Sequence, residues 1–135
     1  MFPAEALTFL RGLSRNNDRE WFQPRKETYE TKVKAPMLAL IEEINSEFGR
    51  TDVVLVVGAN DVTNPAARRP GNAVSGMPIL DVDHARSVIV IKRSMGHGYA
   101  GIENELYGDP KTAMLFSDAK AGLRELRTAL AAYVK

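Results

Sequence analysis

Apolar residues recur every three or four positions in the first third of the chain, a spacing typical of amphipathic helices. One short stripe predicts a first helix, and the polar run at 16–18 (N-N-D) offers capping side chains for the next one. A longer face from Tyr29 to Phe48 predicts a second long helix, whose first turn accepts Pro24. Because Pro36 lies inside this face and lacks a backbone N–H, we expect the helix to kink or split there. The short stripe consists of Leu7, Leu10 and Leu13, and the long face of Tyr29, Val33, Met37, Leu40, Ile41, Ile44 and Phe48.

The rest of the chain alternates short apolar runs with loops. The run at 52–58 (D-V-V-L-V-V-G) is apolar at successive positions, as in a parallel strand that is covered on both faces. Two further strands are predicted at 87–91 and 112–116, and either Ser117 or Asp118 caps a final helix. This order predicts an α/β fold with a parallel sheet. The buried face of the final helix is expected to consist of Leu123, Leu126, Leu130 and Val134.

Composition narrows the class of protein. The 135 residues suit one domain, and 18 Lys and Arg against 17 Asp and Glu exclude a strongly basic nucleic-acid surface. With no cysteine, the chain has no disulfide and no thiolate metal site, which fits a reducing compartment. Apolar runs such as 53–57 and 88–91 are too short to span a bilayer, and the first residues do not resemble a signal peptide. We therefore expect a cytoplasmic domain that binds neither nucleic acid nor membrane.

Polar residues follow each predicted strand. The first strand leads into G-A-N-D at 58–61, and the third leads into S-D-A-K at 117–120. The second is followed by K-R-S at 92–94 and by a glycine loop, G-H-G-Y-A-G, at 96–101. Because the carboxyl ends of parallel strands meet at one edge of a sheet, these groups should converge. The sequence therefore predicts a ligand site at that edge.

The chemistry of 92–94 indicates a phosphate. Lys92 and Arg93 supply two cations and Ser94 supplies a hydroxyl, and an arginine can hold a phosphate with two parallel hydrogen bonds. An arginine is also the usual residue where a dinucleotide site accepts the adenosine 2′-phosphate. The alternative is a strand that ends in solvated cations. The loop at 96–101 favours the binding site, because its glycines allow close approach and Tyr99 can cover a bound ring.

Five motifs follow one another over the region from about residue 43 to 130. They are D-V-V-L-V-V-G-A-N-D-V-T-N-P at 52–65, G-M-P-I-L at 76–80, V-I-V-I-K-R-S-M at 88–95, G-Y-A-G at 98–101 and M-L-F-S-D-A-K at 114–120. Together they resemble the soluble NADP(H)-binding third domain of the proton-translocating NAD(P) transhydrogenase β subunit. The resemblance implies that Lys92, Arg93 and Ser94 contact the 2′-phosphate, and that Tyr99 belongs to a lid loop folding over NADP(H).

The same resemblance implies roles for other residues. Asp61 falls in the region that couples redox state to proton movement in the family. The family's last motif usually reads G-D-A-K, and Ser117 departs from it in a way that should stiffen the turn. No catalytic residue and no metal ligand is expected. The residues expected at the nucleotide are Gly58, Asn60, Asp61, Lys92, Arg93, Ser94, Gly98, Tyr99 and Asp118.

The first residues, 1 to about 40, do not belong to this resemblance. The stretch 16–22 (N-N-D-R-E-W-F) resembles an N-N-x-x-E-W-F motif that opens a bacterial family of unknown function. The rest of that family's pattern does not follow. We therefore expect Trp21 and Phe22 to be core anchors of a helical hairpin, in preference to binding residues.

A complete third domain in the transhydrogenase family resembles a doubly wound sheet, whose N-terminal half holds a glycine-rich pyrophosphate turn. The match to G-x-G-x-x-G at 96–101 follows a cationic strand end and precedes no clear apolar helix, so we interpret it as a chance match. The chain is therefore predicted to be a chimera, with a helical segment at 1–49 and half of a nucleotide-binding fold at 50–135, together one compact domain. Its expected architecture is a helical hairpin packed on a three-stranded parallel half-Rossmann sheet with a C-terminal helix.

The sequence leaves three possible functions open. The first is a truncated or chimeric NADP(H)-binding module of transhydrogenase type, with weak or lost NADP binding and no independent catalysis. The alternative is a recombined or engineered structural protein without ligand function, stabilised as a homo-oligomer. In both, the loss of half a sheet exposes the strand at 52–58, so we expect a homodimer through the strand edge or the open sheet face.

The third function is an enzyme acting on a small substrate, and the sequence disfavours it. His84 and His97 have neither a cysteine nor paired carboxylates at catalytic or metal-binding spacing. Glu103 and Glu105 are expected to be solvated loop charges and not an acid–base pair.

Overall fold

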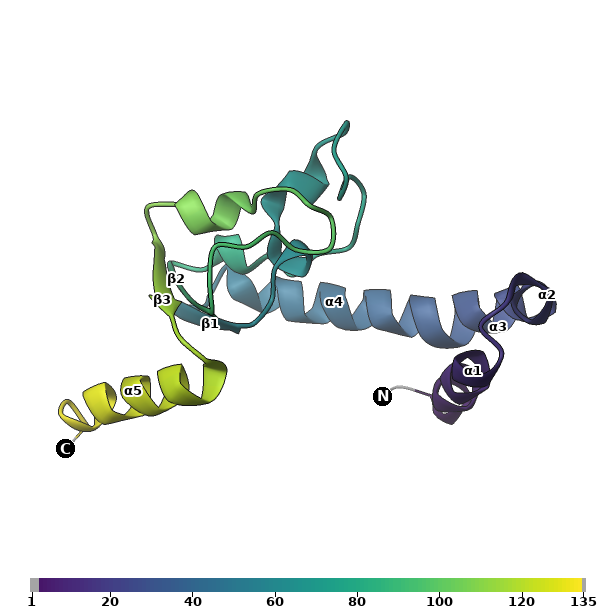
Figure 1. The fold of residues 1–135 in the computed structure, drawn as a ribbon, viewed down its shortest axis with the longest axis horizontal. Helices are drawn as coiled ribbons and strands as arrows, with labels where there is room; N and C mark the ends of the chain where they lie inside the picture. Colours follow the sequence, from purple (N-terminus) through teal and green to yellow (C-terminus); the bar gives the residue numbers. More distant parts are fainter. Residues whose placement is uncertain (1–2, 135) are drawn as a thin grey trace. The chain divides into compact units, whose positions relative to one another are not determined.

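The computed structural model describes residues 3–134 and divides the chain into two compact units (Figure 1). The first unit is Met1–Ile44, and the second is Asn45–Lys135. The first consists of helices only, and the second holds the sheet and the candidate site. Among the described residues, no helix combines the length and the apolar character that a membrane span requires.

Short helical segments build the first unit. Helix α1 (Ala4–Arg15) is followed by α2 (Arg19–Phe22), and Asp18 caps α2 by accepting a hydrogen bond from Trp21 N at 2.7 Å. The predicted capping role of the polar run at 16–18 is therefore confirmed. Pro24 lies in the first turn of a 3₁₀ segment, as expected for a residue without a donor. The segments that follow are this 3₁₀ turn (Gln23–Arg25), α3 (Lys26–Thr28), a π-helical segment (Tyr29–Lys34) and α4 (Ala35–Phe48).

Four aromatic rings pack together in this unit, with centroids 5.4–6.1 Å apart for the contacting pairs. Trp21 and Phe22 are two of them and are half-buried, so they pack in this cluster as predicted, whereas the preference for this role over a binding role stays a prediction. The predicted α1 stripe is wrong, because α1 buries Ala6 and Phe9 and leaves Leu7 and Leu10 exposed. The cause is the Phe9 ring, which contacts the three other rings and so turns its own face of α1 inward. The cluster consists of Phe9, Trp21, Phe22 and Tyr29.

The interruption predicted at Pro36 takes the form of a change in helix type. The π-helical segment ends at Lys34, and Pro36 occupies the first turn of α4, where its missing N–H is least costly. The apolar face along α4 is only partly covered: Met37 and Leu40 are exposed, whereas Phe48 packs on the core of the second unit.

A three-stranded parallel sheet organises the second unit. Its strands β1 (Val53–Val57), β2 (Ser87–Lys92) and β3 (Thr112–Phe116) lie in chain order, so β2 is central. Val57 pairs with Ile91, and Lys92 pairs with Phe116, so the three strands end near one another. These strands and the C-terminal helix α5 (Ala119–Ala131) confirm the predicted α/β class.

One face of the sheet carries the main core. Val56, Val88 and Val90 are buried there against Val82 and Leu106, which come from 3₁₀ turns in the loops. A second buried cluster of Ala66, Ala67, Val74 and Ile79 fills the long loop after β1. The 3₁₀ turns of these loops are Asp61–Thr63, Pro65–Arg68, Val82–His84 and Glu105–Gly108.

The opposite face is largely open, which corrects two sequence predictions. Helix α5 approaches it closely at Gly122, where an added Cβ would lie 3.1 Å from Ile91 Cγ2. β1 was predicted to be covered on both faces, yet Val53 and Leu55 are 55% and 42% exposed. The predicted buried face of α5 is also wrong, because Gly122 is the buried residue of this helix, Leu126 is half-buried, and Val134 beyond its end is 76% exposed. The exposed side chains of the predicted α5 face are Leu123, Leu130 and Val134.

The reason for both errors is geometric. A regular apolar pattern shows that a face can be buried, whereas burial needs a neighbouring element to cover it. Leu55 and the leucines of α5 instead line an open groove of about 590 Å³. The described residues therefore present a largely apolar groove on this side of the sheet.

Ion pairs connect charged residues of the loops that follow β1 and β2. Arg68 binds the carboxylates of Asp81 and Asp83, and the hydrogen bond from Arg68 holds the pKa of Asp83 below its usual value against the opposing effect of burial. Arg69 pairs with Glu105, so Glu105 is not simply solvated as predicted.

Candidate functional site

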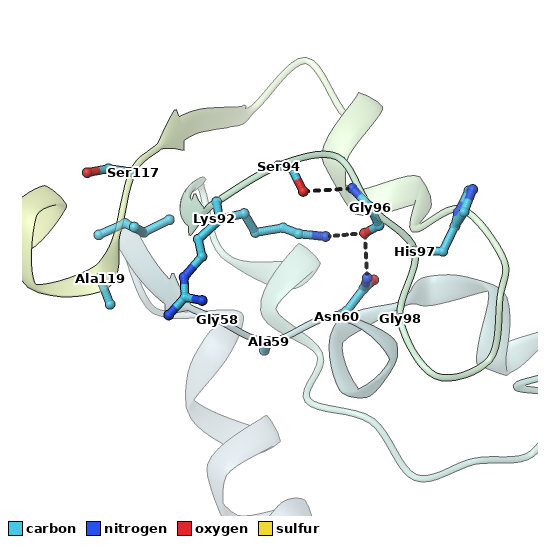
Figure 2. A pocket seen from close by; sticks show the side chains of 12 residues that line it. Gly58, Ala59, Asn60, Lys92, Ser94, Gly96, His97, Gly98, Ser117 and Ala119 are labelled. Atoms are coloured by element: carbon cyan, nitrogen blue, oxygen red, sulfur yellow. Dashed lines mark hydrogen bonds between the residues drawn. The ribbon is translucent and has the colours of Figure 1, made fainter.

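The carboxyl ends of the three strands meet around a pocket of about 460 Å³ (Figure 2). β1 contributes Gly58 and Asn60, β2 contributes the run 92–94, and Ser117 follows β3. Gly96 and Gly98 of the glycine loop line it as well. Parallel pairing in register produces this convergence, because Gly58 N donates to Ile91 O at 3.1 Å and Ser117 N donates to Lys92 O at 2.9 Å.

Six of the nine sequence-predicted residues line this pocket, and three do not. Asp61 lies behind the glycine loop, Tyr99 is fully exposed, and Asp118 sits next to the pocket at the start of α5. Their predicted contacts with a nucleotide stay predictions. The six lining residues are Gly58, Asn60, Lys92, Arg93, Ser94 and Gly98.

Of the two cations at the end of β2, Lys92 and Arg93, Lys92 is the more restrained. Its Nζ donates to Gly96 O at 2.9 Å (Figure 2). It also lies 4.5 Å from the centre of the Tyr107 ring. Partial burial lowers the pKa of Lys92, and the negative charge of Asp61 opposes this effect. The ammonium group is thus held in one place at the edge of the pocket.

Arg93 is the loosely held cation. Its side chain is 86% exposed, and its Nη2 lies 3.8 Å from Oδ2 of Asp118, beyond hydrogen-bond distance. Asp118 meanwhile caps α5 by accepting a hydrogen bond from Lys120 N at 3.0 Å, which decides between the two predicted capping residues. Ser94 Oγ accepts from Gly96 N at 3.3 Å and so belongs to the turn that starts the loop. A ligand phosphate could replace the weak Arg93–Asp118 contact at little cost.

Asn60 connects the first strand end to the glycine loop. In one orientation of its amide, Nδ2 donates to Gly96 O at 3.3 Å, as drawn in Figure 2. In the other orientation the amide donates to Tyr107 Oη at 3.2 Å, and its oxygen accepts from Gly98 N at 2.7 Å and Lys92 Nζ at 3.2 Å. The second orientation pairs more donors with acceptors and is the better satisfied one.

Asp61 binds the glycine loop from behind. Its Oδ2 accepts from Ala100 N at 2.9 Å, and its Oδ1 is buried without a hydrogen-bond partner among the described residues. A Cβ on residue 98 would lie 2.2 Å from this Oδ1, so a larger residue there requires the carboxylate or the loop to shift. The close approach of Gly98 therefore sets how tightly the loop packs on Asp61.

Sequence reasoning missed the buried polar residues that join the loops. Asn64 Nδ2 donates to Glu103 O at 3.0 Å, and Asn104 Nδ2 donates to Asn60 O at 2.9 Å. Tyr107 Oη donates to Ala59 O at 2.9 Å. Asn64 precedes a proline and Asn104 precedes another turn, so both look like ordinary turn residues in the sequence. Their burial could not be predicted without knowing that the two loops touch.

A sequence profile described as NAD(P) transhydrogenase beta subunit matches residues 29–129, which is most of the chain. The chain belongs to this family. The match begins earlier than the resemblance at about 43–130 and includes residues that the sequence analysis assigned to the helical segment. The chimeric origin of the first residues stays a prediction.

Two curated relatives agree with the profile. Both carry the name NAD(P) transhydrogenase subunit beta, one from Rhodospirillum rubrum and one from the strain ATCC 11170 of that species. Each is 60% identical to this transhydrogenase-family chain over 81 residues, which is 59% of the chain and 18% of the relative. The chain thus spans less than a fifth of the length of these relatives.

Proposed function

We propose that this chain is an NADP(H)-binding module of transhydrogenase type that binds the nucleotide weakly and does not catalyse hydride transfer by itself. The pocket at the strand ends would receive the adenosine end of NADP(H), with the 2′-phosphate at 92–94. The observation that carries this proposal is Arg93, an exposed cation on the pocket rim whose partner Asp118 is 3.8 Å away.

The two cations suit a phosphate for different reasons. Arg93 is free to form two parallel hydrogen bonds with phosphate oxygens, and Lys92 adds a fixed positive charge nearby. Ser94 supplies a hydroxyl at the same strand end. NADH lacks the 2′-phosphate and would leave these groups without an anionic partner, so the site should prefer NADPH.

We expect weak binding of NADP(H) because the pocket lacks a glycine-rich turn for the pyrophosphate. The G-x-G-x-x-G match at 96–101 is interpreted as a chance match, because it follows the cationic end of the second strand and precedes no clear apolar helix. No other G-x-G-x-x-G sequence occurs in the chain to hold a pyrophosphate. Hydride transfer would further need a second nucleotide, whereas the proposed site at 92–94 accounts for one nucleotide only. The proposed module therefore recognises one end of the nucleotide.

Isothermal titration calorimetry with NADPH and NADH tests this proposal. Calorimetry is preferable to fluorescence because the single tryptophan, Trp21, belongs to the other unit. We expect the unsubstituted chain to prefer NADPH by about tenfold, or 1.4 kcal/mol, and Arg93→Ala to abolish this preference. Arg86→Ala is the matched control, because Arg86 is also exposed but pairs with Asp52 at the opposite end of the sheet.

Two results would contradict the proposal. One is an NADPH preference that survives in Arg93→Ala. The other is no heat of binding from either nucleotide at millimolar concentration, which would support the structural protein without ligand function.

We further propose that two copies associate through the open side of the sheet. Support comes from β1, which is an edge strand, and from the apolar side chains of Val53 and Leu55 that it exposes beside the α5 groove. We expect sedimentation velocity to show a concentration-dependent dimer and Leu55→Lys to shift it to monomer. Val62→Lys changes an exposed apolar residue in the 3₁₀ turn Asp61–Thr63 and should leave the dimer intact. A clean monomer at high concentration would contradict this.

A further inference from the structure

Tyr107 contacts the candidate phosphate site from outside its pocket. It lies in the 3₁₀ turn Glu105–Gly108 and has no assigned role. Its ring centre is 4.5 Å from Lys92 Nζ, and its hydroxyl donates to Ala59 O at 2.9 Å. One side chain thus touches both the cation at the end of β2 and the backbone that follows β1.

The three N–H groups of Lys92 explain why this contact matters. One donates to Gly96 O at 2.9 Å, and a second can donate to Asn60 Oδ1 at 3.2 Å. The Tyr107 ring lies within cation–π distance of the same ammonium group. Lys92 is therefore held from three sides, and the hydrogen bond to Gly96 O ties it to the glycine loop.

Tyr107 is itself well fixed. Its backbone N donates to Asn104 O at 3.1 Å, and Asn104 is buried and bonded to Asn60 O. Burial raises the pKa of the Tyr107 phenol, so the hydroxyl stays protonated and donates to Ala59 O at neutral pH. The Tyr107 ring is therefore a fixed contact for the Lys92 ammonium group.

We propose that Tyr107 is a positioning residue that acts through Lys92: its ring holds the ammonium group at the pocket edge and, through Gly96 O, orders the glycine loop at 96–98. The inferred ordering of the loop depends only on the contacts among Tyr107, Lys92 and Gly96 O. Its consequence for NADPH preference rests on the proposed function. Tyr107 thereby links the loop that would cover the ligand to the charge that would attract its phosphate.

Hydrogen exchange measured by NMR on the chain without nucleotide tests the loop contact. We expect Tyr107→Leu and Lys92→Met each to speed exchange of the Gly98 amide, which bonds to Asn60, several-fold. The double variant should exchange no faster than either single variant, because both remove the same contact. Tyr107→Phe keeps the ring and should resemble the unsubstituted chain. The Val90 amide, in the central strand, reports any general loss of stability.

Additive effects of the two substitutions, or unchanged Gly98 exchange in Tyr107→Leu, would overturn the inference. Equal acceleration at Val90 and Gly98 would also overturn it, because it would mean general destabilisation. Titration of the same variants with NADPH and NADH is a separate measurement. Where the unsubstituted chain binds NADPH, Tyr107→Leu should reduce the preference several-fold and Tyr107→Phe should retain it. Where it binds neither, the proposed function fails while the exchange data still decide the role of Tyr107.

Discussion

Replacement of Asn64 by alanine is expected to lower the free energy of unfolding of the second unit by about 3 kcal/mol. Asn64 is 0% exposed and bridges two loops: Nδ2 donates to Glu103 O at 3.0 Å, and Oδ1 accepts from Ala66 N at 3.1 Å. Alanine would leave the Glu103 carbonyl and the buried Ala66 amide without these partners and would also leave a small cavity. Both effects act in the same direction, which makes this the largest expected change in stability.

Urea denaturation followed by far-UV circular dichroism and by NMR of the β2 amides measures this effect. Trp21 fluorescence would report the other unit. Val62→Ala is the matched control, because Val62 is two residues away and 46% exposed, and it should change the free energy of unfolding by less than about 0.5 kcal/mol. A loss below about 1 kcal/mol in Asn64→Ala would show that water or a rearranged loop satisfies the two backbone groups.

Replacement of Gly98 by alanine is expected to detach the glycine loop from Asp61 and to cost about 2 kcal/mol of stability. The added Cβ would lie 2.2 Å from Asp61 Oδ1 and 2.7 Å from Oδ2, so either the carboxylate or the loop must move. Any such movement breaks the hydrogen bond from Ala100 N to Asp61 Oδ2. We therefore expect the Ala100 amide to lose its protection from hydrogen exchange, together with any preference for NADPH that depends on an ordered loop.

Two further variants separate this clash from a general effect of losing a glycine. Gly96→Ala places its Cβ 3.3 Å from Ser94 Oγ, a flexible side chain, and should leave Ala100 protected. Asp61→Ala removes the obstructing carboxylate, so adding Gly98→Ala to it should cost little more stability. If Gly98→Ala is equally harmful in both backgrounds, the clash with Asp61 is not the cause.

Local chemistry made several parts of the fold predictable. The β3 strand spans the predicted residues 112–116, and β1 and β2 differ from prediction by one residue at their ends. Asp18 and Asp118 cap helices because a short acceptor before a helix binds an unpaired backbone N–H, whatever surrounds it. The K-R-S run could be placed at the pocket for a similar reason, since parallel strands all end at one edge.

Predictions failed where burial depends on a neighbour distant in sequence. The apolar periodicity of α5 is real, yet the helix touches the sheet at Gly122 and leaves Leu123 and Leu130 exposed. In α1 the ring of Phe9 determines the buried face, because it packs on aromatic side chains that follow in α2 and the π-helical segment. Periodicity records which face is apolar, but not which elements reach it.

The sequence by itself determined the family, the parallel strands with their caps, and the cations at the end of β2, because each depends on residues close together in the chain. The tertiary structure alone decided how those cations differ. Lys92 is restrained by Gly96 O and the Tyr107 ring, whereas Arg93 extends into solvent 3.8 Å from Asp118. It also decided that Asn64 is buried and that residue 98 lies against the Asp61 carboxylate, where a Cβ would clash. The environments of Asn64 and residue 98 depend on contacts between loop residues 39 positions apart in the chain, and such contacts exist only once the sheet has brought its strand ends together.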